Sequence, residues 1–265
     1  MERYFDESPT ATAPLSLDPI TLATTLAQER PDTSDRPWVA TNMVATLDGA
    51  ATLDGRSGGI GGPGDRAVFT AIRALADVIV VGAGTVRTER YRAAVPSPEV
   101  QEWRVAHGRR AIPTVAVVTA SGRLGDVPLL QPDPALAVEP PTPLVYCGSD
   151  TPEAALADLR RTAEVVQGAS PRVAAAEVVA DLAERGHRHI LCEGGPALLA
   201  QFHDADLLDD WFVTVGPLVS AGPAPRLMSA RVEQVRALDL VHVWGHEGVL
   251  FLRHRRPLTG RAPRG

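Results

Sequence analysis

The chain has 265 residues, of which 45% are hydrophobic and 22% are charged, and its formal net charge is −6 at pH 7. This composition excludes wholesale disorder, and the length suffices for one large α/β domain that needs no disulfide or metal. The negative charge argues against a general nucleic-acid or membrane surface, so we expect a small-molecule partner, no nucleic acid and no membrane.

The sequence contains no lysine, so all 26 basic residues are arginines. Schiff-base and P-loop lysines are therefore excluded, and any phosphate must be bound by arginine, backbone amides or hydroxyl groups. The cysteines Cys147 and Cys192 lie far apart in apolar runs. We interpret both as core residues of a cytoplasmic protein, and the histidine spacing predicts no metal site.

Apolar strand-like runs alternate with helical patterns along the chain, which predicts an α/β fold with a mostly parallel sheet. The expected strands are 38–46, 78–81, 113–119, 143–147, 163–166, 189–193 and 210–215. The expected helices lie near 65–76, 152–160, 174–185 and 195–203. Polar residues 1–16 and 256–265 are expected to be flexible tails around a single domain at 17–255.

The last part of the chain has a different pattern. The stretch LDLVHVWGHEGVLFLRHR alternates on either side of residues 245–248, which predicts an antiparallel hairpin at the end of the sheet. In a sheet of this kind, we expect the ligand site at the carboxyl ends of the parallel strands.

The first of three glycine-bearing turns is GGIGGPG at residues 58–64. Gly59, Gly61 and Gly64 formally satisfy the dinucleotide fingerprint GxGxxG. However, the polar stretch before the turn is no buried strand, and no acidic residue follows at the expected offset. We interpret this segment as a flexible loop over a site.

The second turn lies in VIVVGAGTVRTERY, residues 78–91, where a buried strand ends at Gly82. Gly84 would let backbone amides approach a ligand, and Thr85 could cap a short helix or bind a phosphate. An ordinary strand-to-helix turn would explain the same pattern.

The third turn lies in ILCEGGPALLAQF, residues 190–202. Gly194 and Gly195 stand where the amino end of a helix would meet a pyrophosphate. Because Glu193 precedes this anion site, its carboxylate is expected to face another partner.

A doubled TLDG unit follows the first predicted strand. Turn chemistry explains Asp48-Gly49 and Asp54-Gly55. Asn42 differs, because an amide within an apolar strand needs hydrogen-bond partners, which a substrate would supply.

Three segments in this order, RPWVATNMVATLDGA, DRAVFTAIRALADVIVVGAGTVR and ILCEGGPALLAQF, resemble the reductase domain of bacterial riboflavin biosynthesis. The resemblance covers about residues 36–254. It implies a dihydrofolate-reductase-like fold with helices on both faces of the sheet, a homodimer, and a cis peptide between the paired glycines. It also implies that NADPH reduces the imine form of 5-amino-6-(5-phosphoribosylamino)uracil.

The resemblance assigns residues to the two ligands. The positions implied for the cofactor are Ala45, Gly59, Thr85, Ser121 and the segment 195–201, which includes Gly195, Pro196, Ala197 and Leu198. The glycine turns described above add Gly82, Gly84 and Gly194 to the expected cofactor site, and Glu89 is expected there as well. The positions implied for the substrate are Ser57, Arg66 and Glu193, and Asn42 is a fourth expected substrate residue because its amide needs partners within the strand. Ser121 would meet the 2′-phosphate with Arg123 as its charge partner, and Arg66 would meet the ribose phosphate.

Two departures from the family pattern affect the phosphate pocket. Asn42 stands where a lysine is usual, and Glu89-Arg90-Tyr91 replaces an Asp-Asp-Pro run. The zinc deaminase motif often found before this domain is absent, so a stand-alone reductase is expected.

Alternatives remain for both the proton donor and the function. Asp65 or an ordered water would supply the proton, although Asp65 could equally be a helix cap. The departures would permit a reductase of dihydrofolate or another pterin. A nucleotide-binding protein without turnover is a third hypothesis.

Overall fold

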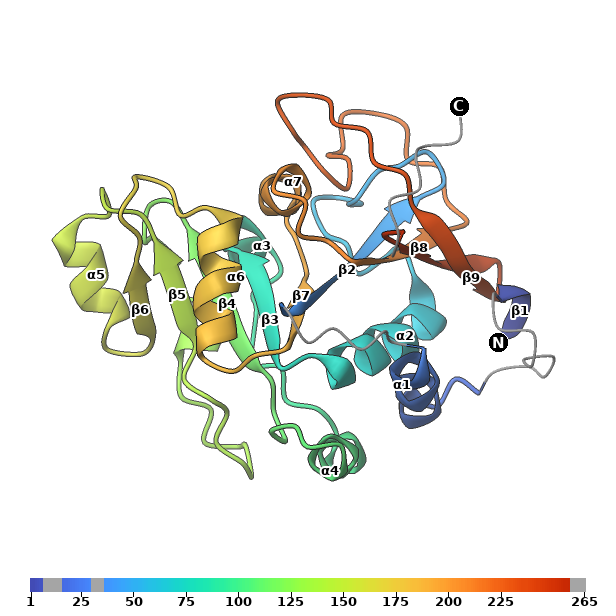
Figure 1. Cartoon of the computed structure of the whole chain (residues 1–265), viewed down its shortest axis with the longest axis horizontal. Coiled ribbons are helices and arrows are strands. Elements are labelled where there is room, and N and C mark those ends of the chain that lie inside the picture. The colour runs from blue at the N-terminus through green and yellow to red at the C-terminus, as the bar shows by residue number, and fades with distance from the viewer. Residues whose placement is uncertain (7–15, 30–35, 258–265) are drawn as a thin grey trace.

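The computed structural model describes residues 1–6, 16–29 and 36–257, and a ten-stranded sheet forms its centre (Figure 1). The strands are β1 (Glu2–Asp6), β2 (Trp38–Thr46), β3 (Val78–Gly82), β4 (Thr114–Thr119), β5 (Leu144–Cys147), β6 (Glu164–Gln167), β7 (His189–Cys192), β8 (Asp210–Gly216), β9 (Asp239–His246) and β10 (Val249–Arg255). Their order is β1-β9-β10-β8-β2-β7-β3-β4-β5-β6. The run from β8 to β6 is parallel, and β1, β9 and β10 extend it antiparallel. The parallel run and the hairpin of β9 and β10 agree with the sequence prediction, whereas β1 was not predicted.

Helices cover both faces of this sheet (Figure 1). They are α1 (Pro19–Gln28), α2 (Gly62–Leu75), α3 (Ala83–Thr88), α4 (Pro98–Ala106), α5 (Glu153–Leu159), α6 (Ala175–Glu184) and α7 (Pro196–Asp204), with a short 3-10 turn at Pro128–Leu130. Leu22, Ile72 and Trp103 place α1, α2 and α4 in one apolar core. Val178 and Leu199 place α6 and α7 in a second core on the other face.

All seven strands and four helices expected from the sequence are present, with shifts of a few residues at their ends. Helix α3 is the short helix that the turn after Gly82 suggested, and two helices, α1 and α4, are additional. The start of α1 carries a recognisable cap, because the side chain of Asp18 accepts a hydrogen bond from the backbone N–H of Thr21 at 2.9 Å and Pro19 follows it.

The expectation for residues 1–16 is wrong in its first part. Residues 2–6 form β1, which pairs antiparallel with β9. Gly245 permits this pairing, because a Cβ there would lie 2.3 Å from the Tyr4 ring. The remainder of that expected tail, 7–15, and most of the other, 258–265, lie outside the described residues.

The predicted hairpin is confirmed as β9 and β10. Its two-residue turn is Glu247-Gly248, with φ values of 50° and 80°. Two positive φ values match the right-handed twist of the flanking strands, and glycine adopts the second without steric cost.

The core prediction for the cysteines is also confirmed. Cys147 and Cys192 are both free and buried. Burial raises the pKa of the Cys192 thiol to about 12. Within the described part of the chain, no helix has the length and apolar character needed to cross a membrane.

Candidate functional site

Two adjoining cavities lie at the carboxyl ends of the parallel strands. The first, which we call the Glu193 cavity, has a volume of about 550 Å³, and the second, the Ser121 cavity, about 660 Å³. Both are lined by Thr52, Thr85, Glu89, Gly195, Pro196 and Pro225. The two spaces are therefore contiguous, and two ligands bound there would lie against each other.

The turn between β7 and α7 separates the two cavities. Its Gly194-Gly195 peptide is cis, as the resemblance implies, and the carbonyl oxygen of Gly194 accepts a 2.7 Å hydrogen bond from the N–H of Gly82. A Cβ on Gly195 would lie 2.7 Å from the Thr85 hydroxyl oxygen, so no larger residue fits there. The paired glycines thus let two backbone segments meet beside the amino end of α7.

Glu193 lines the Glu193 cavity and not the Ser121 cavity. Its side chain is only 4% exposed, and its carboxylate pairs with Arg73 through two hydrogen bonds of 2.7 Å, from Nε and Nη2. The Tyr91 hydroxyl also donates to it. The charge of this buried carboxylate is therefore balanced within the protein.

Arg73 and Tyr91 were not among the predicted site residues. The Arg73 guanidinium lies over the Phe69 ring, 4.1 Å from its centroid, and 5.6 Å from that of Tyr91. Arg66, Phe69 and Arg73 all line the cavity from one face of α2. Their i, i+3, i+7 spacing was a usable signal, because a helix presents such positions on one side.

Asp65 lies in the first turn of α2 and accepts a 2.6 Å hydrogen bond from the Thr214 hydroxyl of β8. It is not the N-cap, which is Gly61, so the structure does not support the alternative of a helix cap. Burial raises the pKa of Asp65, and the hydrogen bond from Thr214 and the charge of Arg66 only partly oppose this. Asp65 lines the Glu193 cavity and can retain a proton there.

Ser57 and Glu89 hold the loop after β2 against the end of α3. A carboxylate oxygen of Glu89 accepts from the backbone N–H of Ser57 at 2.9 Å and from its hydroxyl at 3.0 Å. Asn42 and Arg66 line the same cavity. The Asn42 side chain makes no hydrogen bond with another described residue, which leaves its amide available to a ligand.

The Ser121 cavity contains most of the residues expected at the cofactor. Gly82, Gly84, Thr85, Glu89, Ser121, Gly195, Pro196, Ala197 and Leu198 line it. Thr85 lies within α3 and is not its cap, which is Gly82. The expected charge partner Arg123 is not among the lining residues, whereas Arg87 and Arg172 are.

Three expected positions lie beside these cavities rather than in their walls. Gly194 acts through its carbonyl hydrogen bond to Gly82. Ala45 is buried in β2, and Gly59 is exposed in the loop after it. The GxGxxG segment at residues 59–64 is preceded by a loop and not by a strand. This confirms the interpretation that it is not a Rossmann dinucleotide-binding turn.

Residues 217–238, between β8 and β9, lie beside α7 and the end of β2 and supply a wall that sequence reasoning missed (Figure 1). The carbonyl of Pro225 accepts a 2.8 Å hydrogen bond from the N–H of Ala51. Asp48 accepts from the amides of Ser220 and Ala221, and its pKa is lowered to about 2, mainly by the Thr46 hydroxyl and also by these amides. Asp48 therefore holds residues 217–238 in place through these hydrogen bonds and also shapes the turn after β2.

The turn interpretation of Asp54-Gly55 is confirmed, since both residues have positive φ within a tight turn closed by Leu53 and Arg56. Among the described residues, no group of three or more His, Cys, Asp or Glu side chains could hold a metal ion.

Comparisons with known proteins agree with this geometry. Residues 37–249 match the model of the RibD C-terminal domain family. The chain is 29% identical over 188 residues to a 2,5-diamino-6-ribosylamino-4(3H)-pyrimidinone 5′-phosphate reductase of Archaeoglobus fulgidus, covering 71% of this chain and 83% of the relative. A reductase of the same name from Methanothermobacter thermautotrophicus is 28% identical over 193 residues, or 73% and 83% of the two chains.

A crystal structure of a pyrimidine reductase-like protein from Corynebacterium diphtheriae superposes with a TM-score of 0.78 at 24% identity, over 88% of this chain and 98% of that one. This likeness shows the fold and confirms the α/β class expected from the sequence. The match to the family model spans most of the sheet and every residue that lines either cavity. This chain belongs to the RibD C-terminal domain family.

Proposed function

We propose that this protein is an NADPH-dependent reductase of a pyrimidine ribosyl phosphate of the 5-amino-6-(5-phosphoribosylamino)uracil type. One observation carries the proposal: the Glu193 cavity and the Ser121 cavity adjoin at Thr85, Glu89 and Gly195. Family membership and the reductase names of the archaeal relatives support the same reaction class.

The Ser121 cavity suits a dinucleotide. A Cβ on Gly84 would meet open space, while Gly195 has no room for one, so backbone rather than side chain faces a ligand at this wall. The amino end of the nine-residue helix α7 favours a pyrophosphate there, and Ser121 with Arg87 and Arg172 offers a hydroxyl and charges for a 2′-phosphate. When bound, NADPH supplies the hydride.

The Glu193 cavity suits the pyrimidine and its phosphate. The Glu193 carboxylate, held in place by Arg73 and Tyr91, can accept hydrogen bonds from N–H groups of the ring. Arg66 and the Ser57 hydroxyl would bind the ribose phosphate, and the Asn42 amide would bind a polar group of the substrate.

Reduction of the imine also requires a proton on nitrogen. Asp65 is the side chain we assign to this step, because its burial favours the protonated form and it faces the cavity. Thr214 orients the carboxyl through its 2.6 Å hydrogen bond.

A cytoplasmic homodimer completes the proposal, with light scattering as its check. The outer edge of β9 is paired with β1 and that of β10 with β8, so the terminal hairpin presents no unpaired strand edge to a second copy of the chain. The homodimer would therefore form through a face of the sheet or through the antiparallel end as a whole.

The test is NADPH oxidation by the purified protein, followed by absorbance, with separate substrates. These are 5-amino-6-(5-phosphoribosylamino)uracil, its 2-amino counterpart named for the archaeal relatives, and dihydrofolate. We expect turnover of a pyrimidine ribosyl phosphate and tighter binding of NADPH than of NADH. Turnover of dihydrofolate alone would favour a pterin reductase, and no turnover of any substrate would favour a nucleotide-binding protein.

A further inference from the structure

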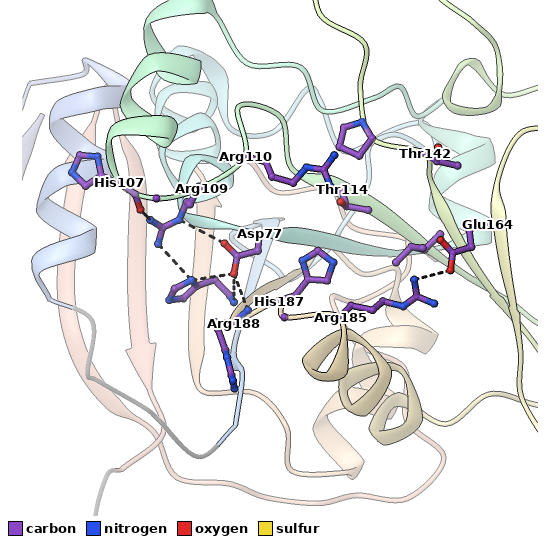
Figure 2. Close-up of a pocket in the computed structure, with 15 residues that line it drawn as sticks. Asp77, His107, Arg109, Arg110, Thr114, Thr142, Glu164, Arg185, His187 and Arg188 are labelled. Carbon is purple, nitrogen blue, oxygen red and sulfur yellow. Dashed lines mark hydrogen bonds and ion pairs between the residues drawn. The ribbon is translucent and has the colours of Figure 1, made fainter.

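A third cavity, of about 780 Å³, lies at the amino ends of the parallel strands (Figure 2). Asp77 immediately precedes β3, Thr114 and Glu164 begin β4 and β6, and His187 precedes β7. The proposed reductase site lies beyond the carboxyl ends of the same strands. This amino-end cavity is therefore a separate space, and the reduction chemistry does not use it.

The amino-end cavity is basic although the protein is acidic. Its walls carry four arginines, Arg109, Arg110, Arg185 and Arg188, against two carboxylates, Asp77 and Glu164. With its histidines neutral, the lining has a formal charge of +2, from four arginines minus two carboxylates. The whole chain carries −6. An excess of guanidinium groups in a concave wall attracts anions.

The arginines differ in how far the protein already engages them. Arg185 pairs with Glu164 at 2.7 Å and with Asp181 at 2.6 Å, and Arg109 pairs with Asp77 at 3.8 Å. Arg110 makes no hydrogen bond or ion pair through its guanidinium with any described residue. In Figure 2 its side chain extends over the cavity, whereas Arg188 points away from the other labelled residues.

His187 lies in the middle of the amino-end cavity, between Asp77 and Arg185 (Figure 2). It is half-buried, and its ring makes no hydrogen bond with a described residue. Burial lowers the pKa of His187, with the nearby charges of Arg185 and Arg110 acting in the same direction and those of Asp77 and Asp181 opposing it. The neutral ring can therefore gain a proton when an anion arrives beside it.

We propose that the amino-end cavity is a second ligand site, which binds a small phosphorylated molecule with its phosphate between Arg110 and His187. Guanidinium groups bind phosphate through paired hydrogen bonds, and the hydroxyl groups of Thr114 and Thr142 line the same wall. The volume exceeds what inorganic phosphate needs and lies within the range of cavities that hold small organic ligands.

The test is a titration of the full-length protein with inorganic phosphate at several fixed pH values and constant ionic strength, with chloride as the replaced anion. The readout is the NMR resonance of the His187 ring, which the His187→Gln variant assigns by its loss. We expect a saturable shift and a rise in the pKa of His187, because a bound phosphate stabilises the imidazolium. A resonance that responds equally to chloride and phosphate would overturn the proposal.

Two arginine variants separate a built site from general charge attraction. Arg110→Gln should weaken phosphate binding about tenfold, the loss of one charge-assisted contact. Arg161→Gln, an exposed arginine outside the cavity, should leave binding unchanged. Equal weakening in both variants would contradict the site. The His187 readout is local, so its outcome does not depend on whether the protein reduces a pyrimidine.

Discussion

Each end of the parallel sheet carries a partly buried aspartate, and the pKa of the carboxyl group is shifted in opposite directions at the two ends. At the carboxyl end, burial raises the pKa of Asp65, and a single Thr214 hydroxyl donates to it. At the amino end, burial also acts to raise the pKa of Asp77, but this is outweighed and the value falls to about 2. The difference lies in the donors and not in the burial.

Asp77 lies where several donors converge. One of its oxygens accepts from the backbone N–H groups of Arg188 and His189 at 2.8 and 2.9 Å, and the His189 ring lies 3.3 Å away. Backbone amides and cations favour the ionised form, so Asp77 serves as a fixed anion that ties the start of β3 to the start of β7. Asp65 has only the Thr214 hydroxyl and the charge of Arg66, which do not offset its burial, so its carboxyl group keeps its proton to a higher pH than an ordinary aspartic acid does.

We expect the strongest change in activity when Asp65, the proposed proton donor at the carboxyl end of the sheet, is replaced. Asp65→Asn should lower kcat by about 10²–10⁴-fold, the usual contribution of a positioned acid, and leave the Kd for NADPH unchanged. Because the raised pKa means that the ionised carboxylate destabilises the folded state above pH 3.8, the variant should be at least as stable as the parent at neutral pH. An unchanged kcat would assign the proton to water.

The same substitution at the other end is the matched control. Asp77→Asn should retain kcat and lose stability of about 2 kcal/mol at neutral pH, since its folded pKa of about 2 lies below the ordinary 3.8. This contribution is complete above pH 3.8 and disappears as the pH falls toward 2. Urea unfolding at several pH values measures it, and a loss that does not shrink in acid would contradict the assignment.

A smaller loss of activity is expected at Glu193, which pairs with Arg73, and none at Glu164, which pairs with Arg185. Glu193→Gln should lower kcat/KM about 10–100-fold, because a charge-assisted hydrogen bond to the substrate is lost and Arg73 is left unbalanced. NADPH binding, measured by fluorescence titration, should not change. Glu164→Gln, which removes the partner of Arg185 at the amino end, should leave kcat/KM as it is. Equal kinetics for both variants would make Glu193 a structural residue only.

The strands and the main helices could be predicted because apolar periodicity reports burial directly. β2 was predicted at its exact bounds, since apolar and β-branched residues predominate in it and most of them are buried. Helices α1 and α4 are short and moderately amphipathic, so their pattern is weak beside that of α2. Strand β1 depends on a partner edge more than 230 residues away, which no local pattern records.

In the candidate site, too, residues with a local sequence pattern could be predicted and contacts between distant residues could not. Glycines at 82, 194 and 195 were recognisable because a strand-to-helix turn with no Cβ implies close backbone approach. The Arg73–Glu193–Tyr91 contacts join α2, the turn after β7 and the loop after α3, and only the folded chain brings these residues together. Arg123 was expected to be the charge partner of Ser121, which it follows closely in the sequence. Closeness in sequence does not determine where a side chain points, and Arg87 and Arg172 line the cavity instead.

A last prediction, with a weaker expected effect, concerns Gly195, which lines both the Glu193 cavity and the Ser121 cavity. It tests why this wall is made of glycine. Gly195→Ala would place a Cβ 2.7 Å from the Thr85 hydroxyl oxygen, and overpacking of this kind costs about 1–3 kcal/mol in the free energy of unfolding. Displacement of Thr85 or of the turn would also move the amino end of α7, so we expect NADPH to bind about tenfold more weakly.

Gly84→Ala is the matched control, because its Cβ would meet nothing within 4 Å and alanine favours the helix. Chemical unfolding and a fluorescence titration compare the two variants. If Gly84→Ala lost stability as Gly195→Ala does, steric contact with Thr85 could not be the cause; if it kept its stability but lost NADPH affinity, the open space beside Gly84 would be where the cofactor lies.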